Sequence, residues 1–191
     1  AAMLSLSPSA SLDGTENSDT LGWTFNSGSE AFKYLADGDT LILTYTVTVT
    51  DSQSGSDTET VTITITGSND NPDITVGGGD SDAETLTETD AGLTQGGTLS
   101  VSDVDTRDTV AVSVQSVNVT GDDDGLGNGT LQGMLSVDAG NVIDGSSNTG
   151  TINWSFNSGA EAFENLAAGE SLIMAYTVRS TDDEGGADDQ L

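Results

Sequence analysis

The sequence contains no histidine and no cysteine, and only three of its 191 residues are basic. Without imidazole or thiol groups the chain cannot build Ser-His or Cys-His nucleophiles, zinc sites with nitrogen and sulfur ligands, or disulfide bonds. Its only cations are Lys33, Arg107 and Arg179. Binding to nucleic acid or to an anionic membrane surface depends on many basic side chains. We therefore expect no nucleic-acid partner.

The chain also has few aromatic residues and no long apolar run. Hydrophobic residues make up 34% of the sequence and aromatic residues 5%. No apolar run comes near the roughly 20 residues that cross a bilayer, so we expect no membrane insertion. Residues 1–5 carry no basic side chain, and we do not expect them to belong to a secretory signal peptide.

Acidic and small polar residues are abundant instead. Asp and Glu number 32, which sets the formal net charge at −29, and the chain holds 27 Thr, 24 Gly, 23 Ser and 23 Asp. Carboxylates are the ligands of hard divalent cations, so we expect Ca²⁺ to be the cofactor. We do not expect an enzyme, because the acidic residues fall in turns and linkers and none marks a cleft with the paired carboxylates of a glycosidase.

An internal repeat runs through the sequence. Aligning Trp23 with Trp154 sets an offset of 131 residues, and 27 of the 58 positions aligned without a gap are identical. The shared signature reads Trp-x-Phe-Asn-Ser-Gly-x-Glu-Ala-Phe-x-x-Leu-Ala-x-Gly. A long fixed period of this kind is typical of a modular array. It predicts that residues 1–70 are the C-terminal part of one repeat and residues 71–191 the following repeat, which lacks its last strand.

The junction between the copies reads Gly67-Ser-Asn-Asp-Asn-Pro72, and the proline prevents the preceding strand from continuing. With the shared signature, this junction resembles the VCBS-type tandem repeats of large bacterial type I-secreted (RTX) adhesins, which are cadherin-like or immunoglobulin-like sandwiches. The junction itself is similar to the calcium linker of cadherins. The resemblance implies an extracellular protein of the cell surface, with adjacent repeats of the same protein as partners.

Alternating residues predict the strands. Leu41, Leu43, Tyr45, Val47 and Val49 alternate with threonines, and so do Val61, Ile63 and Ile65. A period of two with β-branched residues is typical of paired strands with one buried face. Further alternation over 110–119 predicts a long strand with an irregularity near Ser116, preceded by a strand that contains Leu99 and Val101.

One short helical turn is expected in each copy, over Ser29–Ala36 and Ala160–Ala167, because apolar residues share a helical face there and a glycine follows. Many short strands with Gly and Asp turns indicate an antiparallel sandwich. The predicted fold class is therefore all-β, with antiparallel Ig-like or cadherin-like sandwich modules in tandem.

In a sandwich of this kind, three acidic segments lie at one end of the second copy: 69–73, 102–105 and 182–188. Convergence of these segments would supply the six to eight oxygens that calcium takes. Asp103 and Asp105 are the strongest candidates, since an Asp-x-Asp step after a strand points both carboxylates to one side. The predicted metal ligands are Asn69, Asp70, Asp103, Asp105, Asp182 and Asp188. The alternative is that these are ordinary solvated turn residues.

Other residues receive weaker interpretations. Glu84 and Glu88 are secondary ligand candidates, and the acidic loop Gly121–Gly129 is either a second calcium site or a flexible loop. Trp23 and Trp154 are predicted to pack in the core, with sugar stacking as the alternative.

The sequence thus predicts a non-enzymatic, calcium-rigidified extender repeat of a cell-surface or biofilm adhesin. Two alternatives stay open: a calcium-dependent carbohydrate-binding module, and a filament subunit completed by a strand from a neighbouring subunit. Because the second copy has no counterpart of Val61–Thr66, we also expect its open edge to be completed by neighbouring chain.

Overall fold

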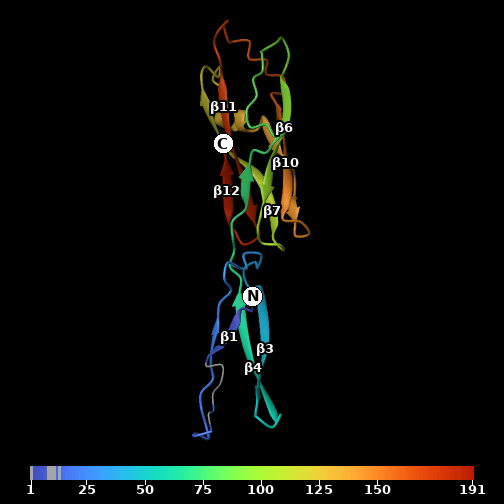
Figure 1. Ribbon diagram of the computed structural model, residues 1–191. Helices are drawn as coiled ribbons and strands as arrows, with labels where there is room; N and C mark the ends of the chain where they lie inside the picture. Colours follow the sequence, from blue (N-terminus) through green and yellow to red (C-terminus); the bar gives the residue numbers. More distant parts are fainter. Residues whose placement is uncertain (1, 8–11, 13) are drawn as a thin grey trace. The chain divides into compact units, whose positions relative to one another are not determined.

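The structure is a computed structural model that describes residues 2–7, 12 and 14–191. Antiparallel strands joined by turns make up most of it (Figure 1). This confirms the predicted all-β antiparallel fold class. The chain divides into two compact units, the first formed by residues 1–32 and 39–67 and the second by residues 33–38 and 68–191.

The first unit contains two two-stranded sheets, β1–β2 and β3–β4. Its strands are β1 (Leu4–Ser7), β2 (Gly22–Phe25), β3 (Thr40–Thr50) and β4 (Ser56–Thr66). In β3, Leu41, Leu43, Tyr45 and Val47 are half-buried and the threonines exposed, as the alternation predicts. Val49, on the same face, is 50% exposed and departs from the prediction. Asp51 closes the β3–β4 turn, because its Oδ1 accepts hydrogen bonds from the backbone N–H groups of Gln53 and Gly55, both over 2.8 Å.

The second unit contains two four-stranded sheets, in the orders β5–β6–β10–β8 and β12–β11–β7–β9. A single short helix lies between β7 and β8 among its described residues. The elements are β5 (Asp73–Thr75), β6 (Thr94–Ser102), β7 (Thr109–Thr120), α1 (Asn128–Gln132), β8 (Leu135–Val137), β9 (Asn141–Asp144), β10 (Thr149–Asn157), β11 (Ile173–Asp182) and β12 (Ala187–Gln190).

The core of the second unit lies between its two sheets. Buried residues of one sheet, such as Leu99 and Ile152, pack in one cluster with buried residues of the other, such as Val110 and Val178. A second cluster surrounds Phe156 and includes side chains from the loops. Two sheets with their inner faces packed together form a β-sandwich.

The predicted irregularity in the long strand is confirmed. In the β7–β11 ladder, Thr177 pairs with Ser116 and Val178 with Val114, so that Gln115 has no partner across the ladder. One extra residue on one strand is a β-bulge.

The two copies of the repeat pair their strands in the same register. Leu4 pairs with Phe25 in the first unit, and Leu135 with Phe156 in the second, each 131 positions on. The β3–β4 and β11–β12 hairpins agree in the same way, since Val47 pairs with Glu59 and Val178 with Gln190. Sequence similarity thus extends to strand pairing, although the first unit has fewer strands than the second in the part that the structure describes.

The predicted helical turns at Ser29–Ala36 and Ala160–Ala167 are wrong, because both segments form consecutive non-helical turns. Phe32 and Phe163 have φ values of 56° and 57°, in the left-handed region that bulky residues rarely adopt. The N–H of Phe163 donates to Oε1 of Glu161 over 2.8 Å, and its ring lies in the core, where the residue is 4% exposed. The helix of the second unit is α1 instead, and its Leu131 is fully buried.

The two tryptophans differ in environment. Trp154 packs against both core clusters, and its Nε1 donates to the carbonyl oxygen of Ser81 over 2.9 Å. Trp23 is 49% exposed, so its predicted place in a core is wrong. In the second unit the indole lies against Gly97 of β6, and no strand equivalent to β6 occurs in the described part of the first unit.

Within the described residues, none of the helical structure is long and apolar enough to cross a membrane.

Candidate metal centre

Three buried aspartates occupy the turn that connects β6 to β7. Asp103, Asp105 and Asp108 are 2%, 0% and 2% exposed. The turn folds on itself, because the N–H of Asp105 donates to Oδ1 of Asp103 over 3.0 Å and the N–H of Asp108 donates to the carbonyl oxygen of Asp105 over 3.4 Å. One carboxylate oxygen from each of the three lies within 4.8 Å of the others. This cluster is called the aspartate cluster below.

The cluster contains buried oxygen atoms that have no hydrogen-bond partner. They include Oδ2 of Asp103 and Oδ2 of Asp108. Burying a carboxylate without a partner costs several kcal/mol in general, because water no longer solvates the charge. A cation between these oxygens removes that cost, so the residues fit a bound metal ion.

The pKa values of two cluster carboxylates are raised, as expected for buried negative charges that are not balanced. Burial raises the pKa of Asp103, and the neighbouring carboxylates of Asp105, Asp182 and Asp70 raise it further. Burial also raises the pKa of Asp108 to about 7, with repulsion from Glu184 as the next cause. A bound cation would act in the opposite direction and favour the ionised forms.

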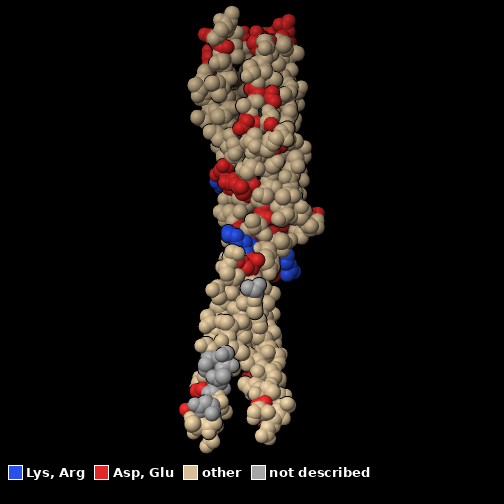
Figure 2. Space-filling model, viewed as in Figure 1, with Lys and Arg blue, Asp and Glu red and all other residues tan. Residues whose placement is uncertain are grey.

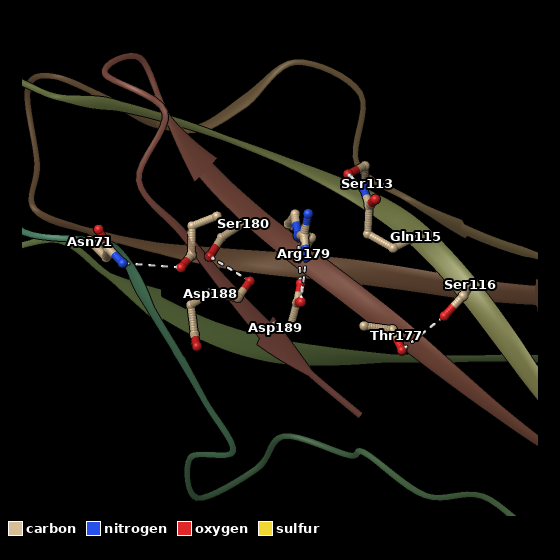
Figure 3. Close-up of polar contacts among 10 residues, drawn as sticks. Asn71, Ser113, Gln115, Ser116, Thr177, Arg179, Ser180, Asp188 and Asp189 are labelled. Carbon is tan, nitrogen blue, oxygen red and sulfur yellow. Dashed lines mark hydrogen bonds and ion pairs between the residues drawn. The ribbon is translucent and has the colours of Figure 1, made fainter.

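The segment Ser68–Pro72, called the connector, is fastened beside the cluster. The N–H of Asp70 donates to Oδ2 of Asp105 over 2.8 Å. The side-chain amide of Asn69 donates to Oδ2 of Asp182 over 3.0 Å, while its Oδ1 is buried without a partner. Asn71 donates to the carbonyl oxygen of Ala187 over 3.3 Å (Figure 3). The connector therefore presents one more orphan oxygen to this end of the unit.

The β11–β12 turn supplies Asp182, which is 5% exposed. Its Oδ1 accepts hydrogen bonds from the N–H groups of Glu184 and Gly186, over 3.0 and 2.7 Å, in the same pattern that Asp51 forms in the first unit. A Cβ at Gly186 would meet the side chains of Asp182, Asn71 and Asn69. A larger residue at Gly186 would therefore require these three side chains to shift.

The six predicted ligands are not all in the aspartate cluster. Asp103 and Asp105 belong to the aspartate cluster, and Asn69 and Asp182 lie beside it through the contacts described above. The side chain of Asp70 is turned to Lys33, with Oδ1 3.1 Å from Nζ. Asp188 serves β-strand packing, because its Oδ2 accepts the N–H of Ile74 over 2.8 Å and joins β12 to β5.

Asp108, Asp183 and Glu184 are absent from the predicted ligands. The oxygens of these three also lie within 4.8 Å of one another. The spacing Asp-x-Asp-x-x-Asp over 103–108 was the available signal for Asp108. Asp183 and Glu184 lie within the predicted acidic segment 182–188 but gave no separate signal.

The weaker candidates lie in other places. Glu84 is exposed, and its Oε1 accepts a hydrogen bond from Ser81 Oγ over 2.6 Å. Glu88 is exposed as well. In the acidic loop, Oδ1 of Asp122 accepts the N–H of Asp124 over 3.1 Å, and α1 begins at Asn128, within the loop.

The chain has three basic side chains against 32 acidic ones. Figure 2 shows acidic side chains at several places on the visible face of the second unit and very few basic ones. Arg179 forms a two-pronged ion pair with Asp189, over 2.7 and 2.6 Å (Figure 3). Lys33 pairs with Asp70. Two of the three cations are therefore engaged outside the aspartate cluster.

No family model matches the chain, and no curated protein matches it significantly. The geometry of the site therefore carries the functional argument.

Proposed function

We propose that the chain is a calcium-rigidified structural extender repeat of a cell-surface or biofilm adhesin. The observation that carries this proposal is the aspartate cluster, with three nearly solvent-free carboxylates and two orphan oxygens. Oxygen donors alone, and carboxylates above all, are the donor set of calcium. Asp103, Asp105 and Asp108 would hold the ion, with the side-chain oxygen of Asn69 as a further donor.

The contacts of the connector support a mechanical role. Asp105 accepts the N–H of Asp70, and Asp182 accepts the amide of Asn69. A cation that neutralises the cluster would hold both carboxylates in the positions from which they fasten the connector. Calcium would then stiffen the segment that leads out of the first unit into the second.

Repetition also supports a spacer. The residues shared between the copies include strand positions such as Phe25/Phe156 and the turn aspartates Asp51/Asp182. Repeating a structural framework suits an extender, whose length grows with each copy. Secretion and adhesion follow from the resemblance to VCBS-type repeats and are part of the proposal.

Thermal unfolding tests the calcium requirement. The chain is stripped of metal and melted in EDTA, in millimolar Mg²⁺ and in millimolar Ca²⁺. Calcium at 100 times its dissociation constant would stabilise the folded state by about 2.7 kcal/mol. We expect a clear rise of the melting temperature in calcium and a smaller one in magnesium, which prefers a rigid octahedral shell. Identical melting curves in all three solutions would contradict the proposal.

Small-angle scattering tests the mechanical role. The same samples are measured in EDTA and in calcium, and calcium is expected to narrow the distribution of interatomic distances. The variant E84Q/E88Q, which removes two acidic charges outside the aspartate cluster, is the control and should respond to calcium as the unmodified chain does. Calcium could raise the melting temperature and leave the distribution of interatomic distances unchanged. That result would support a calcium site and contradict the extender function.

A further inference from the structure

Each sheet of the first unit has an open edge in the part of the chain that the structure describes. There β2 is paired with β1 alone, and β3 with β4 alone. Their counterparts in the second copy are inner strands, because β10 lies between β6 and β8, and β11 lies between β12 and β7. An open edge presents unpaired backbone N–H and C=O groups, to which a further strand can bind.

The repeat shows which strands fit these edges. β1 corresponds to β8 and β4 to β12, because both pairings keep their register at the offset of the repeat. The neighbours without a counterpart are therefore β6, beside β2, and β7, beside β3. In the second unit β6 and β7 are consecutive in the chain and lie in different sheets. One strand–turn–strand segment would thus fill both open edges.

The face of β3 that continues the apolar alternation is more exposed than the same face of β11. Val47 is half-buried, and Val49 is 50% exposed. Their equivalents Val178 and Ser180 are 5% and 0% exposed, at positions where β11 is paired with β7. The difference in burial coincides with the presence of β7 beside β11.

β2 shows the same contrast with β10. Trp23 is 49% exposed, whereas Trp154 is half-buried. Phe25 is half-buried, whereas Phe156 is 7% exposed. Trp154 lies opposite Gly97 of β6, where a Cβ would stand 2.5 Å from Cζ2 of the indole. A strand that covers β2 as β6 covers β10 therefore needs a glycine opposite the first tryptophan.

The β7–β11 ladder defines the side chains that suit β3. Val178 lies opposite Val114 of β7, and Val47 takes the place of Val178 in the first copy. By the same register, Val49 would lie opposite the position of Val112. Apolar pairs directly across a ladder stabilise a sheet. A strand with valines at these positions would cover the exposed face of β3.

A second copy of this chain is a poor source of such a segment. Its own β6 and β7 carry Leu99, Val101 and Val110, which are 3%, 2% and 0% exposed in the core of the second unit. Releasing these strands would expose that core to water. The segment that fits is therefore one that is not already folded into the second unit.

We propose that the first unit binds a strand–turn–strand segment of the β6–β7 type, which pairs with the open edges of β2 and β3. The segment carries a glycine opposite Trp23 and valines opposite Val47 and Val49, and a repeat other than the second copy supplies it. Main-chain hydrogen bonds along the edges give affinity, and the alternate side chains give specificity. The proposal goes beyond calcium binding, because neither β2 nor β3 contributes to the aspartate cluster.

The test adds a synthetic peptide of residues 94–120, which spans β6 and β7, to the full chain. The peptide contains no aromatic residue, so tryptophan fluorescence reports the chain alone. We expect saturable binding with a blue shift of the emission, because Trp23 becomes buried. In W23F the shift should disappear. The titration is made in EDTA and in millimolar calcium, and binding in either solution supports the proposal.

Matched variants test the fit at each edge. The peptide variant G97V places a side chain against Trp23 and should bind at least about tenfold more weakly. T98V adds a valine on the opposite face of the same strand and should bind as the unmodified peptide does. In the chain, V49D places a charge on the covered face and should weaken binding by a similar factor, whereas T48D, on the exposed face, should not. Circular dichroism checks that both chain variants are folded.

Other outcomes overturn the proposal. A blue shift that persists in W23F would show that the peptide acts on the second unit, and equal binding within either matched pair would show that the predicted register is wrong. Dimerisation of the unmodified chain in sedimentation, abolished by V49D, would assign the edges to a second copy. If the free peptide does not bind, residues 94–120 are joined to the N-terminus by a flexible linker, which raises their effective concentration. An unshifted emission of this fusion would then overturn the proposal.

Discussion

The N–H of Asp70 donates a hydrogen bond of 2.8 Å to Oδ2 of Asp105, a side chain that is 0% exposed. The bond joins a connector residue to the buried turn after β6, although 35 positions separate the two in sequence. A charged acceptor makes such a bond stronger than a neutral one, provided that the charge is balanced. Whether Asp105 stays ionised therefore bears directly on how firmly the connector is held.

The first prediction concerns the double variant D103N/D105N. Asparagine keeps an oxygen that can accept the N–H groups of Asp105 and Asp70, so the turn is expected to fold. In EDTA the variant should be more stable than the unmodified chain by about 1–3 kcal/mol, because buried carboxylates no longer repel one another. In calcium it should lose most of the metal-dependent stabilisation.

Urea unfolding of D103N/D105N, with and without calcium, measures both effects. E84Q/E88Q serves again as the charge-matched control and should behave like the unmodified chain. An unchanged response of D103N/D105N to calcium would show that these two aspartates are not ligands.

The second prediction concerns pH in the metal-free state. The pKa of Asp108 is about 7 in the folded protein, against an ordinary value of 3.8. Between these values the folded state binds more protons than the unfolded state, so this group makes the stability fall as pH rises from about 4 to 7. Below that window its contribution to stability is complete.

Urea midpoints of metal-stripped protein at pH 4.5, 6 and 7.5 measure this slope. In D108N the slope should flatten, because the titrating group is gone. In calcium the trend should reverse, since the metal binds the deprotonated carboxylates and its stabilising effect grows with pH. A metal-free protein that becomes steadily more stable up to pH 7.5 would contradict the burial of an unbalanced Asp108.

The third prediction concerns Gly97, which lies against Trp154 across the β6–β10 pair. A Cβ at Gly97 would stand 2.5 Å from Cζ2 and 2.9 Å from Nε1 of the indole. G97A should therefore cost roughly 1–3 kcal/mol, as overpacking generally does, and should displace the indole from Ser81. G129A is the control, since nothing lies within 4 Å of a Cβ at Gly129. Chemical denaturation followed by tryptophan fluorescence compares the two.

The fourth prediction compares the two tryptophans. W154A should destabilise the second unit by roughly 3–5 kcal/mol, as removal of a packed aromatic ring generally does. W23A should cost much less, because the ring of Trp23 is 49% exposed. The fluorescence of the remaining tryptophan reports the unit that was not changed, and circular dichroism reports the whole chain. Equal losses of stability would mean that Trp23 packs as Trp154 does.

The strands were predictable because their pattern is local. Alternation of apolar residues and threonine gives β3 and β4. An interruption of the alternation over 110–119 predicts an irregularity near Ser116, and the structure has a bulge at Gln115 of β7. A side-chain period of two arises from the pleat of the strand itself. The period of two can therefore be recognised in the sequence without knowledge of distant contacts.

The segment around Phe163 was mispredicted for the opposite reason. Ala-x-x-x-Leu spacing with a following glycine is compatible with a helical turn and with two consecutive tight turns. The left-handed backbone of Phe163 is strained, and it persists because the ring packs in the core of the second unit. That gain comes from tertiary contacts, which a local pattern does not contain.

For the candidate metal site, the sequence by itself determined which donor atoms are available. A chain without histidine or cysteine and with 32 carboxylates has only oxygen donors for a divalent cation, and the Asp-x-Asp step after β6 placed two of them on one turn. Only the tertiary structure decided which carboxylates are buried and lie close enough together to hold one cation. Asp108 enters the cluster because the turn folds back, and Asp182 and Asn69 join it from segments 113 positions apart. Burial and orphan oxygens result from packing between distant segments, so a sequence pattern cannot specify them.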